Sequence, residues 1–270
     1  MTHRRYDLIA LDLDGTTLRP DASLSGAVVD AVGRALARGV RVMLATARPP
    51  RAAMIYHREL GLDTPMVTYN GSMLVEADGT VIEHTPLPHG LGRRIAEAAR
   101  ALDPDVVVHV EAGDRWLTDR HDPLLTVASA TAFPPDHVGP LDTFIDGPIT
   151  KLMLLTPDER LPGLHAAITD AFGDEAGVLI CDGHMMQCVD PSVDKSIAVA
   201  RLAETMGVDS ARVMAIGDAP NDTGMLLWAG LGVAVGNAWP EAKHVADAVV
   251  ASNVDDGVAE AIDRFIVASA

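Results

Sequence analysis

The sequence is short of basic residues. Its 270 residues contain 21 Lys and Arg against 38 Asp and Glu, which gives a formal net charge of −17. A surface of this charge repels nucleic acid and anionic lipid, so we expect neither as a partner. It also repels phosphorylated molecules, so any site for a phosphate group needs a cation close by.

Cysteines and long apolar runs are also scarce. The two cysteines, Cys181 and Cys188, flank Asp182-Gly183, which is typical of a hairpin turn. Additional metal ligands are lacking, so we expect two reduced core thiols rather than a metal site or a disulfide. No apolar run reaches the roughly 20 residues of a membrane span. Residues 1–5 lead into a strand without the apolar segment of a signal peptide, so we expect a cytoplasmic protein.

Strand and helix patterns alternate at both ends of the chain. With 48% hydrophobic residues, the chain can bury a full core. Tyr6–Leu13 is nearly all apolar, as expected for a central parallel strand covered on both faces. The alternation runs to about residue 85 and returns at about residue 190. It predicts an α/β fold with a doubly wound, Rossmann-like parallel sheet, built from residues 1–85 and 190–270.

The middle of the chain, residues 86–189, has a different character. Prolines cluster at residues 86 and 88 and again between residues 134 and 148, and strands and helices follow each other in an α+β order. Its expected helices are Leu91–Leu102, Pro123–Ala132 and Glu159–Phe172, and its expected strands include Val106–Glu111, Arg115–Thr118 and Ile149–Thr156. We therefore predict a second domain inserted into the first.

The most informative residues follow strands of the predicted core. Asp12-Leu13-Asp14-Gly15-Thr16 ends the first strand, and Gly217-Asp218-Ala219-Pro220-Asn221-Asp222 follows the strand Arg212–Ile216. Thr46 and Asn70 also follow predicted strands. In open parallel sheets, ligands bind beyond the carboxyl ends of the strands. One site assembled from both ends of the chain is therefore expected.

The carboxylates of this site predict a divalent metal. Two charges about 4 Å apart repel by roughly 4 kcal/mol at an effective dielectric constant near 20. Grouping Asp12, Asp14, Asp218 and Asp222 is therefore unfavourable without a compensating cation. Oxygen ligands without His or Cys favour Mg²⁺ over zinc.

The same residues can carry phosphoryl transfer. The Asp12 carboxylate can attack phosphorus without a base, giving an aspartyl phosphate. Asp14 lies on the same side of an extended chain, where it can give and take the protons. Lys195 can offset the phosphoryl charge, and Thr46 can donate a hydrogen bond to a phosphate oxygen. Taken singly, each has a plainer interpretation: an Asp-Gly turn, a cap, a solvated lysine or a helix N-terminus. The order of these residues in the chain and their placement after strands together favour the catalytic interpretation.

These elements, in this order, resemble the haloacid dehalogenase superfamily of phosphatases. Asp12 to Thr16 match its first motif, Thr46 its second, Lys195 its third and residues 217–222 its fourth. The insertion between Thr46 and Lys195 resembles the large α/β (type IIB) cap of the Cof-type subgroup. Departures are small, with Ala47 and Ser196 where the family often has glycine.

The resemblance implies a role for each matched residue. Asp12 would be the nucleophile and a Mg²⁺ ligand, Asp14 the acid/base and a ligand through its backbone carbonyl, Asp218 the third ligand and Asp222 a support for the metal. The residues that would hold phosphate or border the substrate are Leu13, Thr46, Ala47, Arg48, Asn70, Gly71, Lys195 and Asn221.

The function implied is a Mg²⁺-dependent phosphatase of small phosphorylated metabolites, such as sugar phosphates or related phosphomonoesters. The inserted cap would set substrate specificity. A phosphosugar mutase or phosphotransferase uses the same nucleophile and acid/base pair and stays an alternative. A non-catalytic binding protein on the same fold would lack Asp12 or Lys195, and neither is missing.

Overall fold

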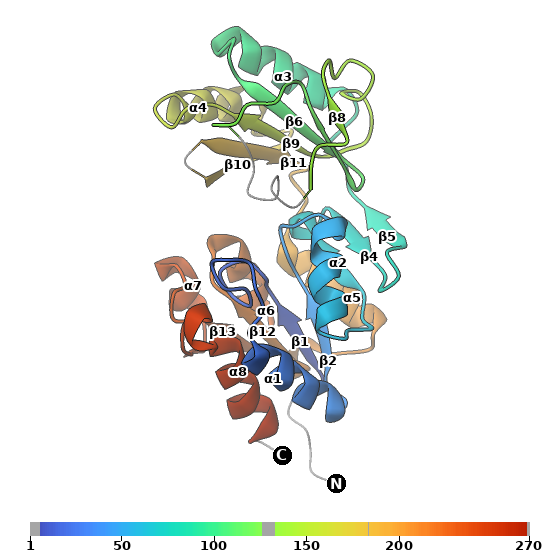
Figure 1. Ribbon diagram of the computed structural model, residues 1–270, viewed down its shortest axis with the longest axis vertical. Coiled ribbons are helices and arrows are strands. Elements are labelled where there is room, and N and C mark those ends of the chain that lie inside the picture. Colours follow the sequence, from blue (N-terminus) through green and yellow to red (C-terminus); the bar gives the residue numbers. More distant parts are fainter. Residues whose placement is uncertain (1–5, 126–132, 183, 269–270) are drawn as a thin grey trace. The chain divides into compact units, whose positions relative to one another are not determined.

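The computed structural model describes residues 6–125, 133–182 and 184–268. The chain divides into two compact units (Figure 1). Met1–Glu83 and Asp194–Ala270 form the first unit, and His84–Val193 form the second unit. Each unit has its own buried apolar cluster, as expected of parts that each build a hydrophobic core.

A five-stranded parallel sheet forms the centre of the first unit, with β1 between β2 and β12. Its strand order is β14 (Ala248–Val249), β13 (Leu231–Ala234), β12 (Val213–Gly217), β1 (Leu8–Leu11), β2 (Arg41–Leu44). All four residues of β1 are fully buried, in agreement with its unbroken apolar sequence. The chain first moves from β1 to β2 and later builds β12, β13 and β14 on the other side of β1. In open parallel sheets, ligands bind beyond the carboxyl ends of the strands at such a reversal, which here are the ends of β1 and β12.

Helices cover both faces of this sheet (Figure 1). α1 packs against α8, while α5 packs against α6. The helices of the first unit are α1 (Gly26–Ala37), α2 (Pro50–Glu59), α5 (Lys195–Thr205), α6 (Thr223–Trp228), α7 (Pro240–Val245) and α8 (Gly257–Ile262). Ser25 caps α1 by accepting a hydrogen bond from the Val28 N–H. The predicted doubly wound α/β fold is confirmed.

The predicted strand that precedes Asn70 belongs to a separate three-stranded sheet and not to the parallel core. This sheet has the order β3 (Met66–Thr68), β4 (Met73–Val75), β5 (Val81–His84). β3 pairs antiparallel with β4 and touches the parallel sheet at one bridge, between Ala45 and Val67. Tyr69 and Asn70 have φ angles of 51° and 57°, and this left-handed turn sends the chain straight back.

The second unit is an α+β structure with a six-stranded sheet, as predicted for the insertion. The strand order is β10 (Gly177–Asp182), β11 (Met185–Val189), β9 (Ile149–Leu155), β6 (Val107–Ala112), β7 (Arg115–Thr118), β8 (His137–Val138). The helices α3 (Leu91–Leu102) and α4 (Leu161–Phe172) share one buried cluster with the sheet. Strand β8 was not predicted, and residues 126–132 of the expected helix Pro123–Ala132 lie outside the described residues.

Two further expectations from composition concern the membrane and the cysteines. Among the helices of the described ranges, none combines the length and the apolar character that crossing a bilayer requires. Cys188 lies in β11 and is buried in the apolar cluster of the second unit. The side chain of Cys181 lies outside the described part of the chain, so the pair of core thiols stays a prediction.

Candidate active site

Asp12 directly follows β1, at the carboxyl edge of the parallel sheet. The Asp12 N–H donates to the Ile216 carbonyl at 3.1 Å, so the pairing of β1 with β12 continues one residue beyond β1. A tight turn then follows, in which the Leu13 carbonyl accepts from the N–H groups of Thr17 and Leu18, both at 2.9 Å. The Thr17 hydroxyl donates to the Asp12 carbonyl. These bonds fix the backbone on both sides of the Asp12 side chain.

The second acidic cluster is brought to Asp12 by the pairing of the two strands. Leu11 lies opposite Ile216, so Asp218 leaves β12 beside the turn that follows Asp12. The Thr16 hydroxyl donates to Asp218 Oδ1 at 2.7 Å. Gly15 has a φ of 77°, and a Cβ atom there would collide with the Asp218 carboxylate. Only glycine therefore allows the turn and Asp218 to approach this closely.

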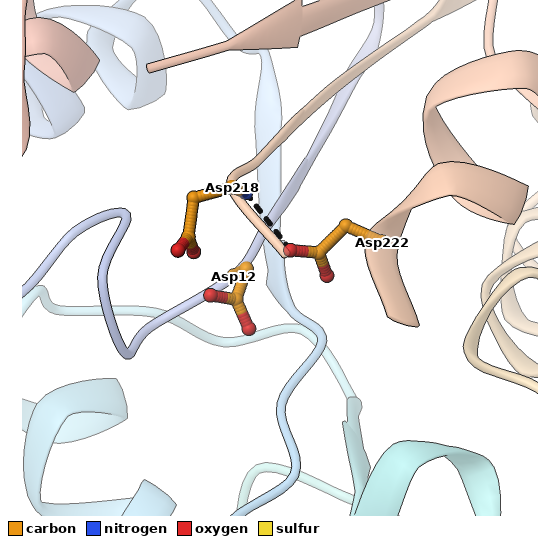
Figure 2. Close-up of side chains that lie close together, drawn as sticks. All are labelled: Asp12, Asp218 and Asp222. Carbon is orange, nitrogen blue, oxygen red and sulfur yellow. Dashed lines mark hydrogen bonds between the residues drawn. The ribbon is translucent and has the colours of Figure 1, made fainter. Parts of the chain in front are cut away.

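Three buried carboxylates meet at this point, those of Asp12, Asp218 and Asp222 (Figure 2). One oxygen from each lies within 4.8 Å of the others. Asp222 is the most constrained of the three. Its Oδ2 accepts from the N–H groups of Asp218 at 2.9 Å and Ala219 at 3.0 Å, and Figure 2 shows the first of these bonds. Asp222 thus shapes the loop that carries Asp218.

Lys195 supplies a cation to the carboxylates. It is the first residue of α5, which Asp194 caps, and its side chain is 1% exposed. The Lys195 Nζ donates to Asp12 Oδ1 at 2.9 Å and to Asp222 Oδ1 at 2.5 Å. Burial alone would lower the pKa of Lys195, but the charges of Asp12 and Asp222 outweigh it and raise the pKa above its ordinary value. The lysine is therefore a fixed positive charge.

One ammonium does not balance three carboxylates. Burial, against the opposing pull of Lys195, raises the pKa of Asp12 well above its ordinary value, and the charges of Asp222 and Asp218 add to the increase. Burial likewise raises the pKa of Asp218 to about 6, although the Thr16 hydrogen bond acts in the other direction. The cluster therefore favours a further cation. Its carboxylate oxygens, without nitrogen or sulfur, are the donor set of a hard divalent ion.

Asp14 lies in a different environment from Asp12, two residues away. Its side chain is 56% exposed and pairs with Arg48. The pair is bidentate, with Arg48 Nε donating to Asp14 Oδ2 at 2.7 Å and Arg48 Nη2 donating to Asp14 Oδ1 at 2.6 Å. The two aspartates thus differ in burial and in partner, as two groups with different roles require.

Thr46, Asn70, Gly71 and Asn221, four further predicted residues, contact one another or the start of α5. Thr46 is fully buried after β2, and its carbonyl accepts from the Asn70 N–H at 2.9 Å. Asn221 Nδ2 donates to Asn70 Oδ1 at 2.9 Å. Gly71 lies against the start of α5, because a Cβ atom there would be 2.8 Å from the Asp194 carbonyl oxygen. Residues after β2, β3 and β12 thus meet around α5. Their roles toward phosphate stay predictions.

The departure at Ser196 is accommodated by the helix cap. The Ser196 N–H donates to Asp194 Oδ1 at 2.7 Å, and its hydroxyl donates to the same oxygen. Gly224 faces Ser196, because a Cβ atom on Gly224 would lie 3.0 Å from the Ser196 hydroxyl oxygen. A small side chain at 196 therefore fits without moving Lys195.

Two asparagines that we did not predict hold the turn after Asp14. Asn237 Nδ2 donates to the Gly15 carbonyl at 2.7 Å, and Asn237 Oδ1 accepts from the Asn253 N–H at 2.9 Å. Asn253 Nδ2 donates to the Leu18 carbonyl at 2.7 Å. Asn237 follows β13, so the rule that ligand-side residues follow parallel strands could have found it.

Asn237→Ala is expected to lower turnover about 10-fold while the protein stays folded. The change removes a hydrogen bond worth roughly 1–1.5 kcal/mol from the turn that positions Asp14. Steady-state kinetics with p-nitrophenyl phosphate, together with the unfolding temperature, checks this. Asn237→Asp keeps the acceptor for Asn253 but not the donor to Gly15, and should lose as much activity. Unchanged turnover in both variants would show that this bond does not position the site.

Comparison with known proteins identifies the family. A family model for haloacid dehalogenase-like hydrolases matches residues 9–262, so the chain belongs to this family. The 5-amino-6-(5-phospho-D-ribitylamino)uracil phosphatase YitU of Bacillus subtilis is 28% identical over 96% of this chain and 97% of its own length. An HMP-PP phosphatase of Cronobacter sakazakii is 29% identical over 86% of this chain and 85% of its own length.

A solved structure agrees with this assignment. The crystal structure of a haloacid dehalogenase-like hydrolase from Bacteroides thetaiotaomicron is 26% identical, covers 96% of this chain and 99% of its own, and superposes with a TM-score of 0.89. The match extends over both units of the chain. The family predicted from the four motifs, and the prediction of an enzyme of that family, are confirmed.

Proposed function

We propose that this chain is a Mg²⁺-dependent phosphatase of small phosphorylated metabolites that works through an aspartyl phosphate on Asp12. The observation that carries the proposal is the buried Asp12 carboxylate, which Lys195 Nζ contacts at 2.9 Å within a cluster of three acidic residues. The names of the relatives support the reaction class, because both are phosphatases of small phosphorylated compounds.

In the first step, a carboxylate oxygen of Asp12 forms a bond to phosphorus as the bond between phosphorus and the leaving oxygen breaks. Asp14 gives its proton to that leaving oxygen, so the product leaves as an alcohol. Lys195 offsets negative charge beside Asp12, and its place at the start of α5 adds the positive end of the helix dipole. The acidic protein can thereby accept an anionic substrate.

In the second step, Asp14 takes a proton from water as the water oxygen bonds to phosphorus. The bond between phosphorus and Asp12 breaks, which releases phosphate and restores the Asp12 carboxylate. Asp14 ends this step protonated and is ready to protonate the next leaving group. The two steps consume one water molecule for each ester cleaved.

Mg²⁺ would be held by the side chains of Asp12 and Asp218 and by the backbone carbonyl of Asp14. When bound, it would neutralise charge on the phosphoryl group. Asp222 acts differently, because its Oδ1 accepts from Lys195 and its Oδ2 from two backbone N–H groups. We therefore assign Asp222 to support of the metal site rather than to direct ligation.

Phosphate would be held by the backbone of Leu13 and Ala47 with Thr46, Lys195 and Asn221. Asn70-Gly71 and Arg48 would border the substrate. The second unit, His84–Val193, would act as the cap and select the organic part of the substrate. The substrate named for the YitU relative, a phosphorylated ribitylamino-uracil, belongs to the class of small phosphorylated metabolites proposed here.

A panel of phosphorylated metabolites tests this function. The purified protein with Mg²⁺ is offered sugar phosphates, nucleotides and cofactor phosphates, and inorganic phosphate is measured. We expect release from phosphomonoesters, with kcat/KM for the preferred class at least ~10⁴ M⁻¹s⁻¹. A new phosphorylated product without inorganic phosphate would identify a mutase or phosphotransferase instead. No reaction with any ester would contradict catalysis.

A further inference from the structure

Arg48 is held in place through its backbone. It follows β2, and its N–H donates to the Thr46 hydroxyl oxygen at 3.2 Å. The Arg48 carbonyl accepts from the Tyr69 N–H at 3.0 Å. The bonds come from the turn that contains Thr46 and from the turn after β3, so the Arg48 Cα is fixed from two sides.

The guanidinium of Arg48 also contacts Tyr56. It lies over the Tyr56 ring, 5.1 Å from the ring centroid, and Nη1 is 3.4 Å from the Tyr56 hydroxyl oxygen. The Tyr56 hydroxyl donates to the Ala22 carbonyl at 2.9 Å, which fixes the ring in turn. The Arg48 side chain is 22% exposed, so its fork has little freedom to turn elsewhere.

The fork formed by Nε and Nη2 of Arg48 constrains the Asp14 carboxylate. Within the described residues, the two bonds from Nε and Nη2 are the hydrogen bonds that the Asp14 carboxylate makes. A half-exposed aspartate without such partners would sample several rotamers. Two parallel bonds fix the plane of a carboxylate as well as its position. The direction of each Asp14 oxygen is therefore set by Arg48.

We propose that Arg48 is a positioning residue that acts through Asp14 and is not a direct phosphate ligand. The inference rests on the proposed function, in which Asp14 transfers the protons. Proton transfer requires a carboxylate oxygen within hydrogen-bond reach of the leaving oxygen or the water. Arg48 supplies the orientation, Tyr56 holds Arg48, and Nε and Nη2 of Arg48 each donate a hydrogen bond to Asp14.

Kinetics of Arg48→Gln, Arg48→Lys and Asp14→Asn test this role. For Arg48→Gln we expect kcat for p-nitrophenyl phosphate to fall ~10- to 100-fold, the scale of losses from a misplaced catalytic group. KM, and the inhibition constant for inorganic phosphate, should stay within about twofold because phosphate contacts are kept. Arg48→Lys should lose nearly as much kcat, because an ammonium cannot form the fork.

A double-mutant cycle separates action through Asp14 from independent action. Adding Arg48→Gln to Asp14→Asn should change kcat less than twofold, because the group that Arg48 positions is already disabled. Arg34→Gln is the matched control. It breaks another bidentate pair, between Arg34 in α1 and Asp263, neither of which belongs to the proposed site. That variant should keep the kcat of the unmodified protein.

Two results would overturn the inference. One is an Arg48→Gln variant that keeps kcat but raises KM and the phosphate inhibition constant, because Arg48 would then bind phosphate directly. The other is a full loss from Arg48→Gln in the Asp14→Asn background. If Asp14→Asn is too slow to measure, the contrast between kcat and phosphate inhibition decides. If Asp14→Asn keeps full activity, the proposed acid/base role itself fails, whatever Arg48 does.

Discussion

Asp12→Asn is expected to abolish turnover, with kcat lowered at least ~10⁴-fold, the scale of losses when a covalent nucleophile is removed. The amide keeps the shape of the carboxylate and can still accept from Lys195, so the geometry of the site should persist. What is lost is the oxygen that would bond to phosphorus. The measurement is steady-state release of p-nitrophenol from p-nitrophenyl phosphate.

The same variant should unfold at a higher temperature than the unmodified protein when both are free of metal. Because burial raises the pKa of Asp12, the folded state disfavours the ionised form at neutral pH, and a neutral side chain removes that cost. Calorimetry or circular dichroism measures this. A loss of activity together with higher stability separates a catalytic role from a structural one.

Asp21→Asn provides the matched control for Asp12→Asn. Asp21 is exposed in the loop between β1 and α1, where it accepts from the Ser23 N–H at 3.1 Å. The same substitution there should leave kcat unchanged. If Asp12→Asn retains turnover, another residue attacks phosphorus and the aspartyl phosphate mechanism is wrong.

Removal of metal is expected to have an effect of similar size. EDTA should lower kcat at least ~10³-fold, and added Mg²⁺ should restore it, because one lysine cannot offset three buried carboxylates and an incoming phosphate. Mg²⁺ should also raise the unfolding temperature, since it binds the folded cluster and not the unfolded chain. Full activity after exhaustive chelation would show that the cluster serves catalysis without a metal.

The concentration of Mg²⁺ needed for half activity should rise as pH falls below about 6. The pKa of Asp218 is about 6, so protons then compete with the metal for its carboxylate. In the metal-free protein, Asp218 should make stability depend on pH in the direction opposite to that of an aspartate whose pKa is lowered by folding. An aspartate with a raised pKa binds its proton more tightly in the folded state, so stability increases as pH is lowered from 7 toward 5. In Asp218→Asn, both pH dependences should weaken.

The parts of the fold predicted from sequence are those in which local pattern and burial agree. β1 and β12 are fully buried, in agreement with their apolar sequences, and β2 is buried after its first residue, Arg41. The segment Met66–Thr68 has the same apolar look, but its pairing depends on positive φ angles at Tyr69 and Asn70. Asn-Gly favours such a turn, so Asn70-Gly71 did carry a signal for pairing with Met73–Val75, but the apolar run before it was assigned to the parallel sheet.

A similar boundary divides the site. Asp12, Asp218 and Asp222 could be grouped in advance because strand ends converge at one edge of a parallel sheet. Lys195 begins a helix, and its match to the family's third motif added it to the group. The position of the Arg48 guanidinium could not be predicted from the sequence. Its direction depends on the Tyr56 ring and on the Ala22 carbonyl that holds that ring, and no spacing in the sequence relates these groups. Long side chains are placed by tertiary neighbours, whereas short ones after a strand are placed by the backbone.

The pairing of β1 with β12 also sets the order in which the protein can assemble during synthesis. A chain emerges from the ribosome N-terminal end first, and domains fold as units. Strands β6 to β11 of the second unit, from Val107 to Val189, are complete before Val213–Gly217 exists. Asp12 is synthesised early, and its partners Lys195, Asp218 and Asp222 are synthesised much later. A nascent chain therefore has no assembled carboxylate cluster, and no preformed place for a metal ion, until residue 222 has emerged.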